Sequence, residues 1–253
     1  MFSRLMNKQF FVVFLVLLLQ AASCTSSKTI QYENIPLQRA QIELAAEQLL
    51  DIGILIFDPN LPKEEQELIF PEVRKAEARY MPYHLKTTLE DTGFWGGIWV
   101  LPEKSEAMDL IVSGRVEISN GLKVAVRIGV WDITGKEWIN KVYETTVSQS
   151  AYSKRRDHTQ DPYQNLYNKI SNDLLEIKNS LSLAELQRIS EIGDLRFAAE
   201  LIPGVYEDYL EKDSKDIISA KRLPSENDTM MERIRSVKER EFILVDTLNE
   251  YYA

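Results

Sequence analysis

The sequence predicts an α+β fold in which helices pack on a mainly antiparallel sheet, followed by an all-helical C-terminal region. Two features of the apolar residues support this prediction. Between residues 94 and 147 they alternate with polar residues, and short turn sequences separate the alternating runs, which is typical of antiparallel strands. From residue 163 onwards they recur every three or four positions, which indicates helices that are buried along one side.

The first 23 residues have the pattern of a secretory signal peptide. Arg4 and Lys8 precede an apolar run, Phe10–Leu19, which as a helix would reach only about half of a ~30 Å hydrocarbon core. Small residues then precede Cys24, the only cysteine. This stretch resembles the lipobox of bacterial lipoproteins, in which the cysteine is lipidated and becomes the first residue of the mature chain. The resemblance therefore implies a lipid on Cys24.

Two alternatives to lipidation stay open from the sequence. An ordinary signal peptide would leave Cys24 as a free thiol, and a retained membrane helix would keep the leader. The usual leucine three places before the cysteine is Ala21 here. In the lipoproteins that this leader resembles, an aspartate after the cysteine signals retention in the inner membrane. Thr25 stands at that position, so the resemblance implies the periplasmic face of the outer membrane.

Net charge and cysteine count narrow the classes of partner. Residues 1–23 contain two cations and no acidic residue, so their removal changes the formal net charge from −9 to −11. An acidic chain argues against nucleic-acid binding, which needs basic patches that displace counterions. A single cysteine permits no disulfide within the chain. We therefore expect a membrane and another envelope protein as partners, and no nucleic acid.

The segments before the predicted sheet region read as follows. Residues 24–36 have no clear period and are expected to form a tether that lifts the fold off the membrane. Leu37–Leu50 is rich in strong helix formers with apolar residues at helical spacing, which predicts a helix. Ile52–Asp58 is a short apolar run that predicts a buried strand. A second helix is expected at about Pro71–Asp91, kinked or restarted at Pro82.

Four strand candidates follow, at residues 94–101, 109–118, 122–132 and 137–147. Asn120-Gly121 lies between the second and third of them and is a strong hairpin signal. Every second residue from Leu122 to Val130 is apolar, so one face of this strand is expected to be buried. We therefore predict that residues 37–150 form an α+β sandwich domain.

The C-terminal part changes to a helical period. Residues 151–162 are predicted to be a polar linker, whose small basic cluster could meet anionic lipids but is interpreted as solvated. Residues 163–253 are predicted to be a helical region, with helices at 163–181, 182–201 and 227–252. The last of these reaches the end of the sequence without a cap, a pattern that would fit a fragment of a longer protein.

Residues that could carry catalysis are scarce. A metal site needs clustered histidines, cysteines or carboxylates, and the sequence has only His84 and His158, so we expect no metal, no cofactor and no catalytic triad. Asp91-Thr92-Gly93 spells the triplet of aspartic proteases, but its place fits the end of a helix. A hydrolase that uses an Asp/Glu pair stays an alternative, because 39 acidic residues offer many accidental pairs.

The most suggestive cluster is aromatic, because all four tryptophans fall in the predicted sheet region. Trp131 lies on the face opposite the Leu122–Val130 row, beside Lys123 and Arg127. A tryptophan among long cations can form an exposed binding face, and these three residues are our candidate interaction face. The same face could instead seat the C-terminal helices, which is our preferred interpretation because those helices must bury their apolar sides.

The order of these motifs is similar to that in a group of envelope lipoproteins that includes the curli secretion lipoprotein and the lipoprotein activators of penicillin-binding proteins. In them, an early strand and a later Asp-x-x-Val-x-Gly strand that leads into a hairpin share one α/β domain. The matching residues here are Ile52–Pro59, Asp109, Gly114, Asn120 and Gly121. The resemblance covers about half of the mature chain and rests on residues that make the fold.

Together, the leader, the resemblance and the scarcity of catalytic residues predict a non-enzymatic accessory protein. We expect it to be tethered through Cys24 in the cell envelope and to act through protein contacts in envelope assembly or secretion. A homo-oligomer is left open. The alternatives are a cell-wall hydrolase that uses an Asp/Glu pair and a lipoprotein that binds a small ligand.

Overall fold

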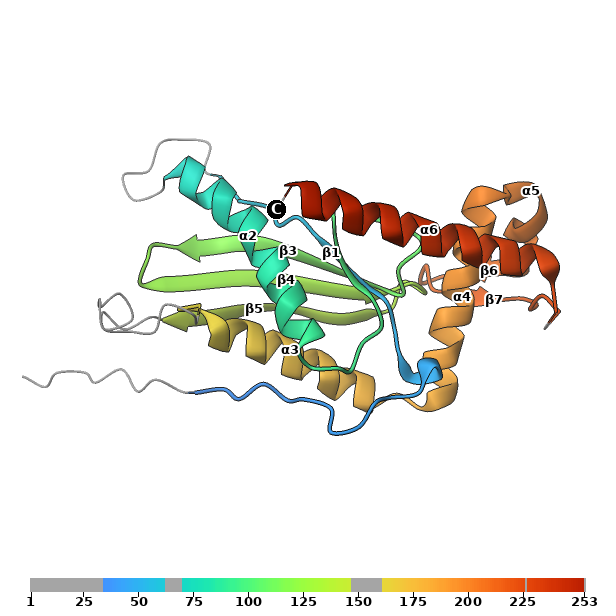
Figure 1. Ribbon diagram of the computed structural model, residues 1–253, viewed down its shortest axis with the longest axis horizontal. Coiled ribbons are helices and arrows are strands. Elements are labelled where there is room, and N and C mark those ends of the chain that lie inside the picture. The colour runs from blue at the N-terminus through green and yellow to red at the C-terminus, as the bar shows by residue number, and fades with distance from the viewer. Residues whose placement is uncertain (1–33, 62–69, 147–160, 226, 253) are drawn as a thin grey trace, which may run out of the picture. The chain divides into compact units, whose positions relative to one another are not determined.

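The fold is organised around a mixed sheet of five strands, namely β1 (Ile52–Leu55), β2 (Ile98–Leu101), β3 (Leu110–Ser119), β4 (Lys123–Asp132) and β5 (Glu137–Thr146). The computed structural model describes residues 34–61, 70–146, 161–225 and 227–252 (Figure 1). The strand order is β2-β1-β3-β4-β5. β1 pairs in parallel with β2 and β3, and the other two pairs are antiparallel. The predicted α+β class is confirmed.

Side-chain chemistry within the chain's own turns fixes the antiparallel meander of β3, β4 and β5. The Asn120 side-chain oxygen accepts hydrogen bonds from the backbone N–H groups of Leu122 (3.2 Å) and Lys123 (2.9 Å). Gly121 has a φ of +78°, which glycine adopts without steric cost. Asp132 closes the β4–β5 turn in a similar way, because its side chain accepts two backbone N–H groups. The predicted hairpin is confirmed.

Helices α2 (Pro71–Glu90) and α3 (Gln164–Asn179) cover one face of the sheet and enclose the first hydrophobic core (Figure 1). Val124, Val126, Ile128 and Val130 point into this core and are fully buried. The first half of α4 (Leu183–Leu201) also joins the first core. Its second half joins a second core on the opposite face, together with α6 (Thr229–Tyr252).

Helix α2 runs without a break through Pro82, where the sequence predicted a kink or a restart. A proline has no N–H to offer to the carbonyl four residues earlier. That carbonyl belongs to Ala78, and it accepts the backbone N–H of Phe57 instead (3.1 Å), which ties the end of β1 to the helix. The helix ends where predicted, with Gly93 at a φ of +70°.

The helix predicted at Leu37–Leu50 is not present. The segment is extended apart from the short 3-10 helix η1 (Ala46–Gln48), and Ile42 is 76% exposed. Its backbone is bound to distant parts of the chain, for example by the hydrogen bond from Ala40 N–H to the Thr92 carbonyl (2.8 Å). Because such partners satisfy the backbone groups, they override the local helix propensity.

The C-terminal region is not entirely helical, although the three predicted helices are confirmed as α3, α4 and α6. Between α5 (Pro203–Tyr206) and α6 lies a two-stranded sheet of β6 (Leu210–Lys212) and β7 (Ile218–Ala220). The first residue of β7 donates its N–H to the Thr134 carbonyl (2.8 Å), which fixes this small sheet to the β4–β5 turn. Strands of three residues are too short to give a periodic signal.

Other predicted segments lie outside the described residues. They are the signal peptide, Cys24 with the first part of the tether, and most of the predicted linker 151–162. In the part of the chain that the structure describes, no helix is both long and apolar enough to cross a membrane. Glu33–Ala253 forms one compact unit, in which the helices after residue 163 share their cores with the sheet.

Candidate functional site

The side of β3, β4 and β5 that faces away from α2 and α3 is called the outer face here. Strand alternation and register place on it the exposed or half-buried side chains of Arg115, Ile118, Lys123, Arg127, Trp131 and Val142, together with the polar side chains of Ser113, Asn140, Glu144 and Thr146. The three residues of the predicted interaction face therefore do share one side of the sheet. Val142 is 39% exposed and lies opposite Arg127 in the β4–β5 register.

The C-terminal helices dock on the same side of the sheet, but on other strands. Phe242 of α6 stacks on Trp99 of β2 with ring centroids 4.1 Å apart, and Ile111 of β3 is buried in the same core. Trp131 lies beside Ile111 in the β3–β4 register and is only half-buried. The C-terminal helices thus cover the Trp99 end of this side of the sheet, and Trp131 borders the exposed end, where binding of a partner stays a prediction.

Both tryptophans lie against a glycine two residues earlier in the sequence. A Cβ atom at Gly97 would lie 1.7 Å from the Trp99 ring, and one at Gly129 would lie 2.3 Å from the Trp131 ring. Only glycine leaves room for the indole in each place. The repeated Gly-x-Trp pattern could have indicated this arrangement, but the sequence analysis missed it.

The cations of the outer face are paired with acidic residues. Lys123 bonds to Glu144 (2.8 Å), and Arg127 Nε donates to Glu117 Oε1 (3.0 Å). Arg115 and Arg127 are cross-strand neighbours. The repulsion between their like charges destabilises this pairing unless nearby acidic residues compensate the charges. Exposed ion pairs contribute little to stability. Their effect is therefore to present two arginines beside an aromatic and two aliphatic side chains, which is the composition of protein interfaces.

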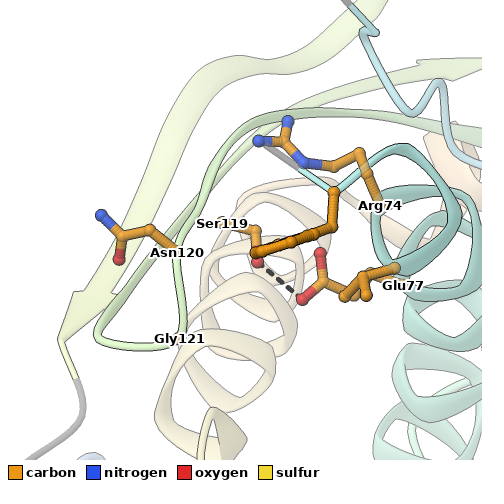
Figure 2. Close-up of a pocket in the computed structure, with 7 residues that line it drawn as sticks. Arg74, Glu77, Ser119, Asn120 and Gly121 are labelled. Atoms are coloured by element: carbon orange, nitrogen blue, oxygen red, sulfur yellow. Dashed lines mark hydrogen bonds between the residues drawn. The ribbon is translucent and has the colours of Figure 1, made fainter. Parts of the chain in front are cut away.

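A hollow of about 330 Å³ lies between the first turns of α2 and the β3–β4 turn (Figure 2). It is lined by Phe70, Val73, Arg74, Glu77, Ser119, Asn120 and Gly121. The Glu77 carboxylate points toward Ser119, whose Oγ donates a hydrogen bond to it (2.6 Å), and the Asn120 side chain points away from both (Figure 2). The hollow thus combines an apolar wall with two charged side chains of opposite sign.

Arg74 is unusual among the residues of this hollow, because it is a cation that is only 4% exposed. Its Nη1 donates to the carbonyls of Val116 (3.0 Å) and Pro59 (3.5 Å). No carboxylate among the described residues forms an ion pair with it. Buried charges in proteins are normally paired, whereas the described residues around this guanidinium offer it only backbone carbonyls. No pattern in the sequence indicates its burial, because that burial depends on the tertiary fold.

Three asparagines of α3 hold the end of the predicted tether and the residues directly after it. Ile35 donates its backbone N–H to Asn165 (3.1 Å), and its carbonyl accepts from Asn168 (2.7 Å). Asn172 accepts the N–H of Gln38 (3.1 Å) and donates to the Pro36 carbonyl (2.9 Å). The asparagines lie three and four residues apart and so share one side of the helix. This spacing is a signal that the sequence analysis did not use.

Asp109, the aspartate of the Asp-x-x-Val-x-Gly run, is buried where α4 meets the sheet, with only 3% of its surface exposed. Its Oδ2 accepts the backbone N–H of Asp51 (2.9 Å), and its Oδ1 has no hydrogen-bond partner. Burial raises the pKa of Asp109 to about 7, Lys238 lowers it, and the charge of Asp51 raises it. Burial also raises the pKa of Asp51. The hollow beside α2 does not contain these two carboxyl groups.

Other residues considered for catalysis have structural partners. His84 Nε2 lies 2.8 Å from Gln164 Oε1, and its ring packs edge-on against Tyr167, so it joins α2 to α3. His158 lies outside the described residues. Within the described ranges, no group of three or more histidine, cysteine or acidic side chains is placed to hold a metal ion.

Comparisons with known proteins add little to this description. No protein-family model matches the sequence, and no curated protein matches it significantly. Among solved structures, a hypothetical protein from Chlamydia trachomatis is similar with 12% identity and a TM-score of 0.34, over 52% of this chain and 99% of that one. A putative neuraminyllactose-binding hemagglutinin homolog from Helicobacter pylori has 11% identity and a TM-score of 0.27, over 64% and 95% of the two chains.

These two likenesses are too weak to carry an argument about fold or function. The similarity to curli-secretion lipoproteins and to activators of penicillin-binding proteins likewise stays a prediction. Any functional proposal must therefore come from this chain's own residues.

Proposed function

We propose that this protein is a lipid-anchored accessory protein of the cell envelope, which binds another envelope protein through its outer face. The observation that carries the proposal is the exposed part of that face, where Trp131 and Val142 lie beside two arginines that are neutralised by acids. Aromatic residues and arginines of this kind are enriched at the centres of protein interfaces. The leader that ends at Cys24 supports the anchor, which several acyl chains would make stable.

The anchor is tested by replacing Cys24 with serine. The wild-type chain should sediment with the membrane fraction, and the Cys24→Ser variant should be released, because it lacks the atom to which the lipid attaches. A Thr25→Ser variant is the matched control and should stay with the membrane. Persistence of Cys24→Ser in the membrane fraction would mean that something other than a lipid on Cys24 holds the protein.

The hydrolase alternative is tested separately on purified cell-wall sacculi. The proposal expects no clearing band from the purified protein in a zymogram. A clearing band that disappears in an Asp51→Asn or Asp109→Asn variant would establish catalysis by these two carboxyl groups, and the accessory role would have to be abandoned.

A further inference from the structure

Arg74 is a buried cation that forms no ion pair with any carboxylate of the described residues. A guanidinium carries five N–H groups in a fixed plane. Here Nη1 reaches two backbone carbonyls, while Nε and Nη2 have no hydrogen-bond partner among the described residues. The side chain nevertheless lines a hollow rather than the solid core. Its anchored half fixes the plane of the guanidinium, and among the described residues nothing occupies the other half, which could therefore pair with a planar anion.

The other walls of the hollow restrict what that anion can be. Glu77 uses Oε1 to accept from Ser119, which leaves its Oε2 able to accept an N–H group. Phe70 and Val73 form an apolar wall and are well exposed in the free protein. A bare inorganic anion would use the guanidinium but would gain nothing from this wall, and it would be repelled by Glu77.

The size of the hollow sets a further limit. At about 330 Å³ it lies at the lower end of the range of ligand pockets, which is about 300–1,000 Å³. It can hold one amino-acid residue but not an extended peptide. Arginine binds a carboxylate through two parallel N–H···O bonds.

We propose that this hollow binds one amino-acid unit with a free carboxylate and an apolar side chain, either at the C-terminus of a peptide or as a free amino acid. The carboxylate pairs with the open half of Arg74, the N–H of the same unit donates to Glu77, and its side chain packs on Phe70 and Val73. The site is independent of the outer face and of the lipid anchor.

The test uses residues 24–253 with Cys24 replaced by serine, which include the whole compact unit Glu33–Ala253. The probes are N-acetyl-leucine, free leucine and N-acetyl-leucinamide, titrated at millimolar concentration into ¹⁵N-labelled protein. The carboxylate probes should shift the Arg74 Nε–H signal and the amide signals of Ser119 and Gly121, and the uncharged leucinamide should not. Stronger binding of N-acetyl-leucine than of leucine would assign the site to peptide termini, and the reverse order to free amino acids.

Two variants separate a specific site from diffuse charge attraction. Arg74→Lys keeps the positive charge but loses the planar pair of donors, and should weaken binding at least tenfold. Lys75→Gln removes a charge from the same turn of α2, outside the hollow, and should leave binding unchanged. The proposal is overturned if no carboxylate probe shifts these signals, if leucinamide shifts them equally, or if the two variants weaken binding to the same extent.

Discussion

The buried carboxyl of Asp109 makes a quantitative prediction about stability and pH. The unfolded chain releases this proton near the ordinary pKa of 3.8, and the folded chain near 7. Between these values the folded state binds more protons, so its stability falls as the pH rises, by about 1.4 kcal/mol per pH unit. Across about three units the total loss is about 4 kcal/mol, and it is complete above pH 7.

Asp109→Asn should remove this dependence. The asparagine cannot ionise, and its oxygen can still accept the backbone N–H of Asp51. Its side-chain NH2 group would take the place of Oδ1, which has no hydrogen-bond partner, and would have no acceptor there. A buried donor without an acceptor lowers the free energy of unfolding by about 1–3 kcal/mol at every pH. The variant should therefore be equal to or less stable than the wild type at pH 5, and its relative stability should rise by about 3 kcal/mol between pH 5 and pH 8.

The measurement is urea denaturation of both chains at intervals from pH 5 to pH 8, with the difference in unfolding free energy plotted against pH. Asp208→Asn, which removes an exposed carboxylate, is the control and should run parallel to the wild type. Parallel curves for wild type and Asp109→Asn would refute the reasoning. They would mean that the Asp109 carboxyl is already ionised in the folded state at pH 5, or that the neighbouring charges of Asp51, Asp194 and Lys238 fully offset the effect of its burial.

Two further predictions concern the segment beside α3 and the outer face. Asn172→Ala removes both hydrogen bonds that hold the chain at Pro36 and Gln38. Hydrogen exchange at the Gln38 amide should therefore accelerate without global unfolding. The control, Asn179→Ala at the end of the same helix, should leave that exchange rate unchanged. The methyl group that Gly129→Ala adds would overlap the Trp131 ring. The variant should therefore be destabilised by about 1–3 kcal/mol, and its tryptophan fluorescence should change. A variant with wild-type stability and spectrum would contradict the described packing.

The sequence was most informative where structure depends on neighbouring residues. The β3–β4 hairpin could be predicted because Asn120 and Gly121 make their turn from their own side chain and backbone. The end of α2 could be predicted for the same reason, since Gly93 supplies the left-handed conformation locally. The alternation along β4 likewise revealed which of its residues enter the core.

The failures occur where distant residues decide the outcome. The helix predicted at Leu37–Leu50 is replaced by an extended segment because distant groups bind its backbone: Asn172 accepts the N–H of Gln38, and the Thr92 carbonyl accepts the N–H of Ala40. The parallel pairing of β1 with β2 and β3 also depends on contacts that no local pattern encodes. No local pattern distinguishes Arg74 from a helix-surface arginine, and only the approach of the carbonyls of Pro59 and Val116 makes it a buried cation.

The central claim, that the outer face binds another envelope protein, is tested most directly by photo-crosslinking in the cell that produces the protein. A photo-reactive residue at Val142 lies on the exposed part of that face, and one at the similarly exposed Leu183, at the start of α4, serves as the control. We predict that Val142 captures one defined envelope protein, that Leu183 does not, and that Arg127→Glu abolishes the adduct. The same adducts from both positions, or none from Val142, would contradict the claim.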